Sequence, residues 1–146
     1  MGIPMRLPPV HPFNPLMALR LIIAAGSNLR AVETVFDAIF EQGRDVSSAT
    51  VIDQLARKLD VQCTETALNS PAIKEKLRQN TTWAITQGIF GVPTLMINDE
   101  IFWGHDAFDM ALDYLKDPRQ FQDNEMRKVE TLPVGIVRQR QEPSLP

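Results

Sequence analysis

The chain has 146 residues, of which 44% are hydrophobic and 23% are charged, a composition typical of a globular domain and not of a disordered or fibrous protein. Its formal net charge is −3 and its basic residues are scattered, which argues against a nucleic-acid binder. No apolar run is long enough for a membrane span, and the N-terminus lacks the apolar stretch of a signal peptide. We therefore expect a cytoplasmic protein that binds neither nucleic acid nor membrane.

The first part of the chain is predicted to be mainly helical. Residues 3–7 alternate loosely and predict a short strand, which Pro8–Pro9 would end. Asn14 followed by Pro15 is typical of a helix start, with Asn14 as the N-cap of a largely buried helix that runs to Ala25. Apolar residues at helical spacing predict a second helix over residues 29–42.

Two further helices are expected before residue 88. Ser47 or Ser48 can cap a helix that carries apolar residues from 51 to 59, and one or two helical turns follow Cys63. Ser70 as N-cap and Pro71 as first residue predict a longer helix to about Gln87, which Gly88 ends.

The segment from Gly91 to Asp106 predicts a hairpin with a helix behind it. A proline-containing loop leads into an apolar strand that ends at Ile97, and a turn at residues 98–100 leads into a second strand at residues 101–103. An amphipathic helix is expected over residues 107–116. Residues 117–146 lose periodicity and predict a peripheral tail, in which residues 134–137 could form a short strand.

Pro93 restricts the backbone of the loop that precedes the first of these strands. A proline donates no backbone hydrogen bond, and it pushes the residue before it, Val92, towards an extended conformation. If the Val92–Pro93 bond is cis, the N–H and C=O of Val92 can turn outward and pair with an extended peptide. The alternative is an ordinary turn before a strand.

The cysteine and histidines offer little chemistry. The single cysteine, Cys63, excludes an internal disulfide and a Cys-x-x-Cys motif within this chain, so a thiol oxidoreductase of the DsbA type lacks its cysteine pair. We expect a buried, inert thiol there. His11 and His105 stand apart in the sequence, so we expect solvated histidines and no metal site.

Three motifs together resemble one known family. Pro12-Phe13-Asn14-Pro15-Leu16, then Gly88-Ile89-Phe90-Gly91-Val92-Pro93-Thr94, then Phe102-Trp103-Gly104-His105-Asp106, resemble 2-hydroxychromene-2-carboxylate isomerases, which are related to kappa-class glutathione transferases and DsbA-like oxidoreductases. The resemblance runs over about residues 2–116. It implies an α/β thioredoxin-like (DsbA-like) fold in a domain of residues 1–116, with a helical insertion at about residues 14–87.

The resemblance also implies a cofactor, glutathione. Val92 would pair its backbone with the cysteinyl unit, and the segment from Trp103 to Asp106 would lie at the γ-glutamyl end, where a carboxylate suits the ammonium group. Each site residue also has a purely structural interpretation: Asn14 and Asp106 as helix caps, Trp103 as core packing. The predicted cofactor-binding residues are Asn14, Val92, Pro93, Trp103, Gly104, His105 and Asp106.

One feature of that family is not matched. Its members begin with a strand and a helix that carry a serine which activates the glutathione thiol, and no residue here corresponds to it, so the catalytic residue is unknown. The chain therefore resembles an N-terminally truncated member, and the missing strand is central to the sheet. Either the chain is a fragment, or a second copy fills the gap as a strand-exchanged homodimer.

Two functions follow as hypotheses. The first is a glutathione-dependent isomerase of an aromatic 2-oxo acid, with weak or no catalysis if the chain is complete. The alternative is a non-catalytic thioredoxin-like remnant or interaction protein that forms a strand-exchanged oligomer.

Overall fold

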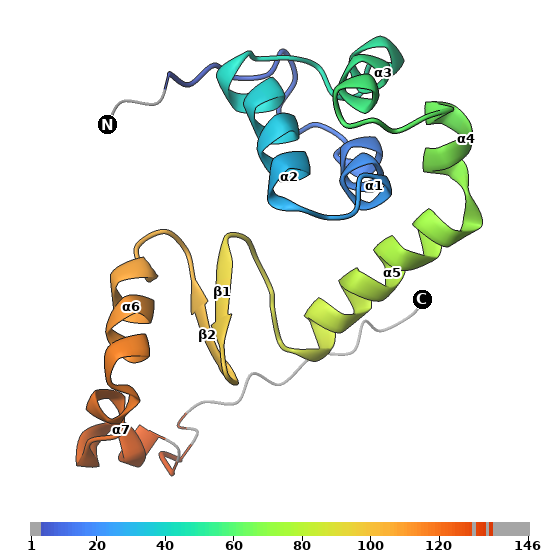
Figure 1. Cartoon of the computed structure of the whole chain (residues 1–146). Helices are drawn as coiled ribbons and strands as arrows, with labels where there is room; N and C mark the ends of the chain where they lie inside the picture. Colours follow the sequence, from blue (N-terminus) through green and yellow to red (C-terminus); the bar gives the residue numbers. More distant parts are fainter. Residues whose placement is uncertain (1–3, 130, 134, 136–146) are drawn as a thin grey trace, which may run out of the picture. The chain divides into compact units, whose positions relative to one another are not determined.

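The structure, a computed structural model, describes residues 4–129, 131–133 and 135, and it divides into two compact units at Gly88. Figure 1 shows the helices of the first unit and the hairpin of the second. The first unit contains α1 (Leu16–Ala24), α2 (Leu29–Phe36), the π-helical turn η1 (Asp37–Glu41), α3 (Ala49–Lys58), α4 (Thr64–Asn69) and α5 (Pro71–Thr86). The second contains β1 (Thr94–Ile97), β2 (Glu100–Trp103), α6 (Phe108–Lys116), the 3₁₀ turn η2 (Pro118–Phe121) and α7 (Asn124–Val129).

The helical unit has its own hydrophobic core, built from the apolar faces of α1 to α4. Each fully buried leucine stabilises the fold by roughly 1.5–3 kcal/mol relative to an exposed one. The largest fully buried side chains are Leu21, Val35, Val46, Leu55 and Leu68. The predicted periodicity of these helices is confirmed for most of the residues at helical spacing, which the core buries or partly buries, whereas Phe36 at the end of α2 is 53% exposed.

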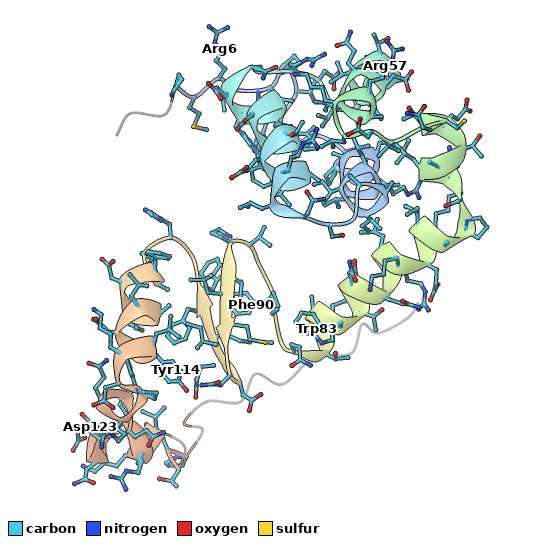
Figure 2. All side chains as sticks on the ribbon, in the orientation of Figure 1. Arg6, Arg57, Trp83, Phe90, Tyr114 and Asp123 are labelled. Carbon is cyan, nitrogen blue, oxygen red and sulfur yellow. The ribbon has the colours of Figure 1, made fainter. Side chains whose placement is uncertain are left out.

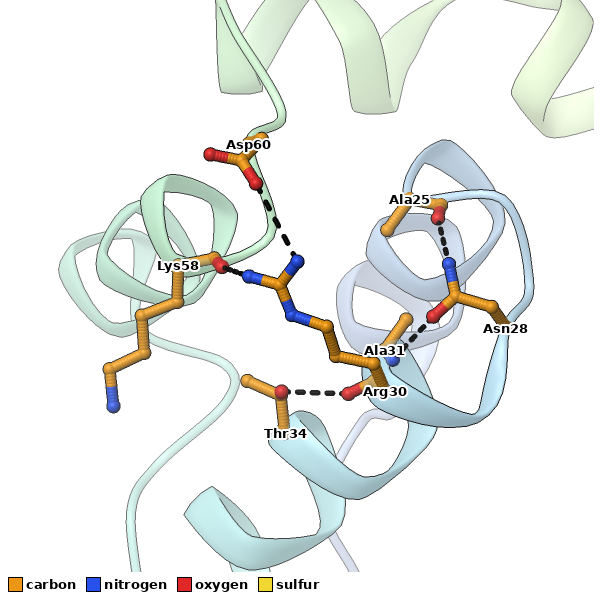
Figure 3. Close-up of polar contacts among 7 residues, drawn as sticks. All are labelled: Ala25, Asn28, Arg30, Ala31, Thr34, Lys58 and Asp60. Atoms are coloured by element: carbon orange, nitrogen blue, oxygen red, sulfur yellow. Dashed lines mark hydrogen bonds and ion pairs between the residues drawn. The ribbon is translucent and has the colours of Figure 1, made fainter.

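Polar contacts fix the ends of α2 and α3, as Figure 3 shows. The side chain of Asn28 caps α2 by accepting a 2.9 Å hydrogen bond from the amide of Ala31, and its own amide donates to the carbonyl of Ala25. The guanidinium of Arg30 donates a 2.7 Å hydrogen bond to the carbonyl of Lys58, the last residue of α3. A cation at a helix C-terminus is favourable because carbonyl groups there carry partial negative charge.

The sequence signals for α5 are confirmed, and those for α1 are shifted by one residue. Ser70 is the N-cap of α5, Pro71 is its first residue, and the Ser70 hydroxyl accepts from the Ile73 amide at 3.4 Å. α1 begins at Leu16 with Pro15 in the N-cap position. Asn14 still accepts a 3.0 Å hydrogen bond from the Leu16 amide, so it binds the helix start from one residue further out.

The strand predicted over residues 3–7 is not present in its described part, residues 4–7. The amide of Arg6 donates instead to the carbonyl of Phe40, at the end of the α2–η1 segment. A strand needs a neighbouring strand to satisfy its backbone groups, and alternation in the sequence does not supply one. Of the strand considered for residues 134–137, only residue 135 lies within the described residues, so this strand stays a prediction.

The hairpin of the second unit packs against α6. β1 and β2 are antiparallel, with Thr94 opposite Trp103 and Ile97 opposite Glu100. The ring centroids of Phe102 on β2 and Tyr114 on α6 lie 5.4 Å apart, an edge-tilted packing typical of aromatic pairs. Figure 2 labels Tyr114 on this helix.

Part of the predicted tail is ordered against the same helix. The ring centroids of Phe121 and Tyr114 lie 5.8 Å apart. The Asp117 carboxylate accepts a hydrogen bond from the Arg119 amide at the start of η2. Residues 118–129 form only the short elements η2 and α7, of four and six residues, which are too short to show a helical periodicity in the sequence. No helix in the described part of the chain is long and apolar enough to cross a membrane.

Candidate functional site

The hairpin brings two loops together at its open end. Because Thr94 is paired with Trp103, the residues just before β1 and just after β2 are neighbours; we call them the proline loop (residues 88–93) and the aspartate loop (residues 104–107). The amide of Gly104 donates a 2.9 Å hydrogen bond to the carbonyl of Pro93, which extends the pairing one step beyond the strands. Most of the predicted site residues lie in or beside these two loops.

The proline loop presents the peptide groups of Val92. The Val92–Pro93 bond is cis, the condition under which the Val92 backbone groups can turn outward, and Val92 is 88% exposed. The carbonyl before it, on Gly91, accepts a 2.6 Å hydrogen bond from the Thr94 hydroxyl, while the carbonyl after it, on Pro93, is held by Gly104. Within the described residues, the N–H and C=O of Val92 itself have no hydrogen-bond partner.

Trp103 packs against the proline loop. Its ring centroid lies 5.2 Å from that of Phe90, which Figure 2 labels in the segment leading into β1. Its indole Nε1 lies 2.5 Å from the position that a Cβ atom would occupy on Gly91. Trp103 is 53% exposed, so it packs against the loop and keeps part of its ring in solvent.

The aspartate loop is shaped by Gly104. This glycine has a φ of +94°, a conformation that other residues adopt only with strain, and a Cβ atom on it would lie 2.5 Å from Oδ1 of Asp106. The capping interpretation of Asp106 is wrong, because the N-cap position of α6 is Ala107 and receives no side-chain hydrogen bond. The Asp106 carboxylate is exposed and accepts no hydrogen bond from the described residues.

The remaining candidates lie elsewhere or are exposed. Asn14 belongs to the helical unit, where it accepts a hydrogen bond from the Leu16 amide, and its contact with a ligand stays a prediction. His105 and His11 are exposed, as expected. The expectation of a buried Cys63 is wrong: this residue is exposed, with a φ of +49° at the position before α4, where the turn directs it away from the core.

Two residues in or beside the proline loop have roles that the sequence did not predict. The Thr94 hydroxyl ties down the Gly91 carbonyl, and the Phe90 ring packs on Trp103. A hydroxyl residue close in sequence to a glycine is a known signal for a side-chain-to-backbone bond, so Thr94 could have been found. In the described part of the chain, no group of three His, Cys, Asp or Glu side chains could hold a metal ion.

Residues 1–116 match the DSBA-like thioredoxin domain. The chain belongs to this family. Similar relatives of this DSBA-like chain carry the name 2-hydroxychromene-2-carboxylate isomerase. The protein from Pseudomonas putida is 33% identical over 81 residues, which cover 54% of this chain and 40% of the relative. The one from Sphingobium xenophagum is 40% identical over 50 residues, which cover 34% of this chain and 26% of the relative.

A solved structure supports the same assignment. The DSBA-like chain aligns with a 2-hydroxychromene-2-carboxylate isomerase at a TM-score of 0.66 and 27% identity, covering 84% of this chain and 62% of that one. The α/β thioredoxin-like fold class and the resemblance to this isomerase are thereby confirmed. The chain aligns with less than two thirds of the length of each of these relatives.

Proposed function

We propose that this protein is a glutathione-dependent isomerase of an aromatic 2-oxo acid and that glutathione binds at the open end of the hairpin. The observation that carries the proposal is the unpaired Val92 backbone, an exposed donor and acceptor between two carbonyl groups that are already held by Thr94 and Gly104. An extended peptide can add to such an edge through its main chain.

The loop geometry suits a short peptide. Glutathione offers one N–H and one C=O on its cysteinyl residue, which match the free C=O and N–H of Val92. Because the groups on either side of Val92 are fixed by hydrogen bonds of 2.6 and 2.9 Å, little backbone entropy remains to be lost on binding. Pre-organisation of this kind favours a ligand that binds through only a few hydrogen bonds.

Asp106 supplies the second recognition element. Its carboxylate is exposed, belongs to the loop that Gly104 ties to Pro93, and accepts no hydrogen bond from the described residues. A free carboxylate next to a peptide-binding edge suits the α-ammonium group of the γ-glutamyl unit, because a charge-assisted hydrogen bond is stronger than a neutral one. These two elements together favour glutathione over an unmodified dipeptide.

The names of the relatives support isomerisation of a 2-hydroxychromene-2-carboxylate or a similar compound as the reaction. Bound glutathione would supply a thiol that adds reversibly to the conjugated 2-oxo acid, so that a double bond becomes single, rotates and re-forms. The role proposed for this chain's own residues is to bind and orient: Val92 fixes the cysteinyl unit, and Asp106 fixes the opposite end of the ligand.

Isothermal titration calorimetry with reduced glutathione tests the binding step. A Cys63→Ser background removes covalent chemistry at the exposed thiol. We expect saturable binding, a preference for glutathione over the dipeptide cysteinylglycine, and a loss of that preference in Asp106→Asn, about tenfold in Kd for one charge-assisted hydrogen bond. Val92→Ala is the matched control, because it keeps the backbone groups. Absence of saturable heat with the Cys63→Ser protein would overturn the proposal.

A second candidate function, a non-catalytic thioredoxin-like protein that forms a strand-exchanged oligomer, is favoured by the small sheet. In the described residues β1 pairs with β2 alone, so the far edge of β1 is unpaired, and a two-stranded sheet is marginally stable by itself. Sedimentation velocity separates the two: a dimer that binds no glutathione supports this candidate, and a monomer that melts cooperatively counts against it.

A further inference from the structure

Gly91 is required by a neighbouring side chain and not by its own backbone. Its φ is not positive, so an alanine could adopt the same conformation. The Cβ atom of that alanine would, however, lie 2.5 Å from Nε1 and 3.3 Å from both Cδ1 and Cε2 of Trp103. The five-membered ring of the indole therefore rests directly on the backbone of Gly91.

We propose that Trp103 is a positioning residue for the ligand-binding loop: its indole clamps Gly91 and Phe90 and thereby fixes the peptide groups of Val92. The inference rests on the proposed function and adds a residue that acts through the loop. Hydrogen bonds from Thr94 and Gly104 hold the carbonyl groups of Gly91 and Pro93, but neither contacts the Cα side of Gly91 or the Phe90 ring. The Trp103 ring contacts both of these, at a centroid distance of 5.2 Å from Phe90.

This arrangement transmits a change at Trp103 to the ligand site over one residue. Gly91 is joined directly to Val92, so a displaced indole removes the contact on the Cα side of the Gly91–Val92 peptide group, whose N–H is the donor offered to the ligand, and leaves this group held by the Thr94 hydrogen bond alone. The partial exposure of Trp103, 53%, means that its indole can swing into solvent without disrupting a buried core. The expected consequence of disturbing the clamp is therefore weaker binding in a protein that still folds.

A double-mutant cycle tests the clamp without any ligand. Gly91→Ala should lower the Tm by about 3 °C or more, because the new methyl group expels the indole. The same substitution in a Trp103→Ala background should shift the Tm by less than about 1 °C, since nothing remains to clash. Equal shifts in the two backgrounds would overturn the clamp.

Fluorescence gives a signature that a general loss of stability does not. The chain has two tryptophans, so Trp83→Phe leaves Trp103 as the single emitter. We expect Gly91→Ala to shift the emission of Trp103 to the red, because the indole moves from the loop into water. Unchanged emission contradicts the proposal.

Calorimetry with reduced glutathione then tests the positioning role. Gly91→Ala and Trp103→Ala should each weaken glutathione binding by about fivefold or more, and Trp103→Phe, which keeps a ring over Gly91, should restore most of it. Undiminished affinity in both alanine variants would overturn the positioning role. If the wild-type protein binds no glutathione while the cycle still shows coupling, the proposed function and the positioning role are both wrong. If the Tm shifts are additive, the clamp alone is wrong.

Discussion

The hydroxyl of Thr94 donates a 2.6 Å hydrogen bond to the carbonyl oxygen of Gly91. This bond closes the proline loop onto the first residue of β1, so the Val92–Pro93 segment between the two bonded residues has both ends fixed. The proline loop is thus held by Thr94, the first residue of β1. Thr94 is also paired with Trp103 across the sheet.

Thr94→Val should open this loop while keeping the β-branched shape that suits a strand. We expect a loss of about 1 kcal/mol in unfolding free energy, the usual net value of one hydrogen bond, and weaker glutathione binding. Chemical denaturation and calorimetry measure the two effects. Thr94→Ser keeps the hydroxyl and serves as the control. Equal losses of stability and affinity in the serine and valine variants would show that the hydrogen bond does not hold the loop.

Gly104→Ala should be among the more damaging single changes in the second unit. The substitution puts a side chain at φ +94° and within 2.5 Å of the Asp106 carboxylate, so a cost of about 1–3 kcal/mol is expected in urea denaturation. Adding Asp106→Ala to the Gly104→Ala protein should recover only the part of the lost unfolding free energy that comes from the clash. Gly135→Ala is the matched control, because a Cβ atom there meets no atom within 4 Å. Similar costs at the two glycines would contradict the assignment.

Asn28→Ala should destabilise the helical unit by about 1 kcal/mol, because the amide of Ala31 loses its capping acceptor at the start of α2. Asn28→Asp keeps the acceptor and loses only the donation to Ala25, so it should retain most of the stability. Circular dichroism melts of the full chain measure the difference. An aspartate variant as unstable as the alanine variant would show that the contact to Ala25, and not the cap, matters.

Asp45 should contribute a small stability term that depends on pH. Hydrogen bonds from the hydroxyl and the amide of Ser47 lower the pKa of the Asp45 carboxyl below its usual value. The folded state therefore favours the carboxylate, so the contribution is complete above about pH 4, the unfolded pKa range, and is lost as the pH falls through the lower folded pKa. Tm measured from pH 6 downwards should fall less steeply in Asp45→Asn than in the wild type. Parallel curves would contradict the prediction.

Local signals in the sequence predicted the helices well. Ser70–Pro71 at one end and Gly88 at the other bracket α5 because capping and helix termination depend on residues within one turn. The strand at residues 3–7 failed because pairing is a non-local property: Arg6 found a partner in Phe40 instead of in another strand. The prediction that Cys63 is buried was wrong for a similar reason. The burial of one residue depends on the conformation of its turn and not on its hydrophobicity alone.

The candidate site was predictable in outline. The spacing of Thr94 and Trp103 around a short turn fixes their pairing, and this pairing brings the proline and aspartate loops together. The contact of the indole with Gly91 was not predictable, because the side-chain rotamer of Trp103 is set by packing against Phe90 and the loop. The roles of the predicted residues in binding glutathione, the division at residue 116 and the dimer stay predictions.

The exposed Cys63 has a practical consequence. It is the single thiol of the chain and belongs to the helical unit, whereas Trp103 belongs to the hairpin unit. A dye that accepts energy from the indole can be attached to Cys63 of a Trp83→Phe protein, so that the chain carries one donor and one acceptor. Energy transfer from Trp103 would then report the separation of the two units in solution and whether a ligand draws them together.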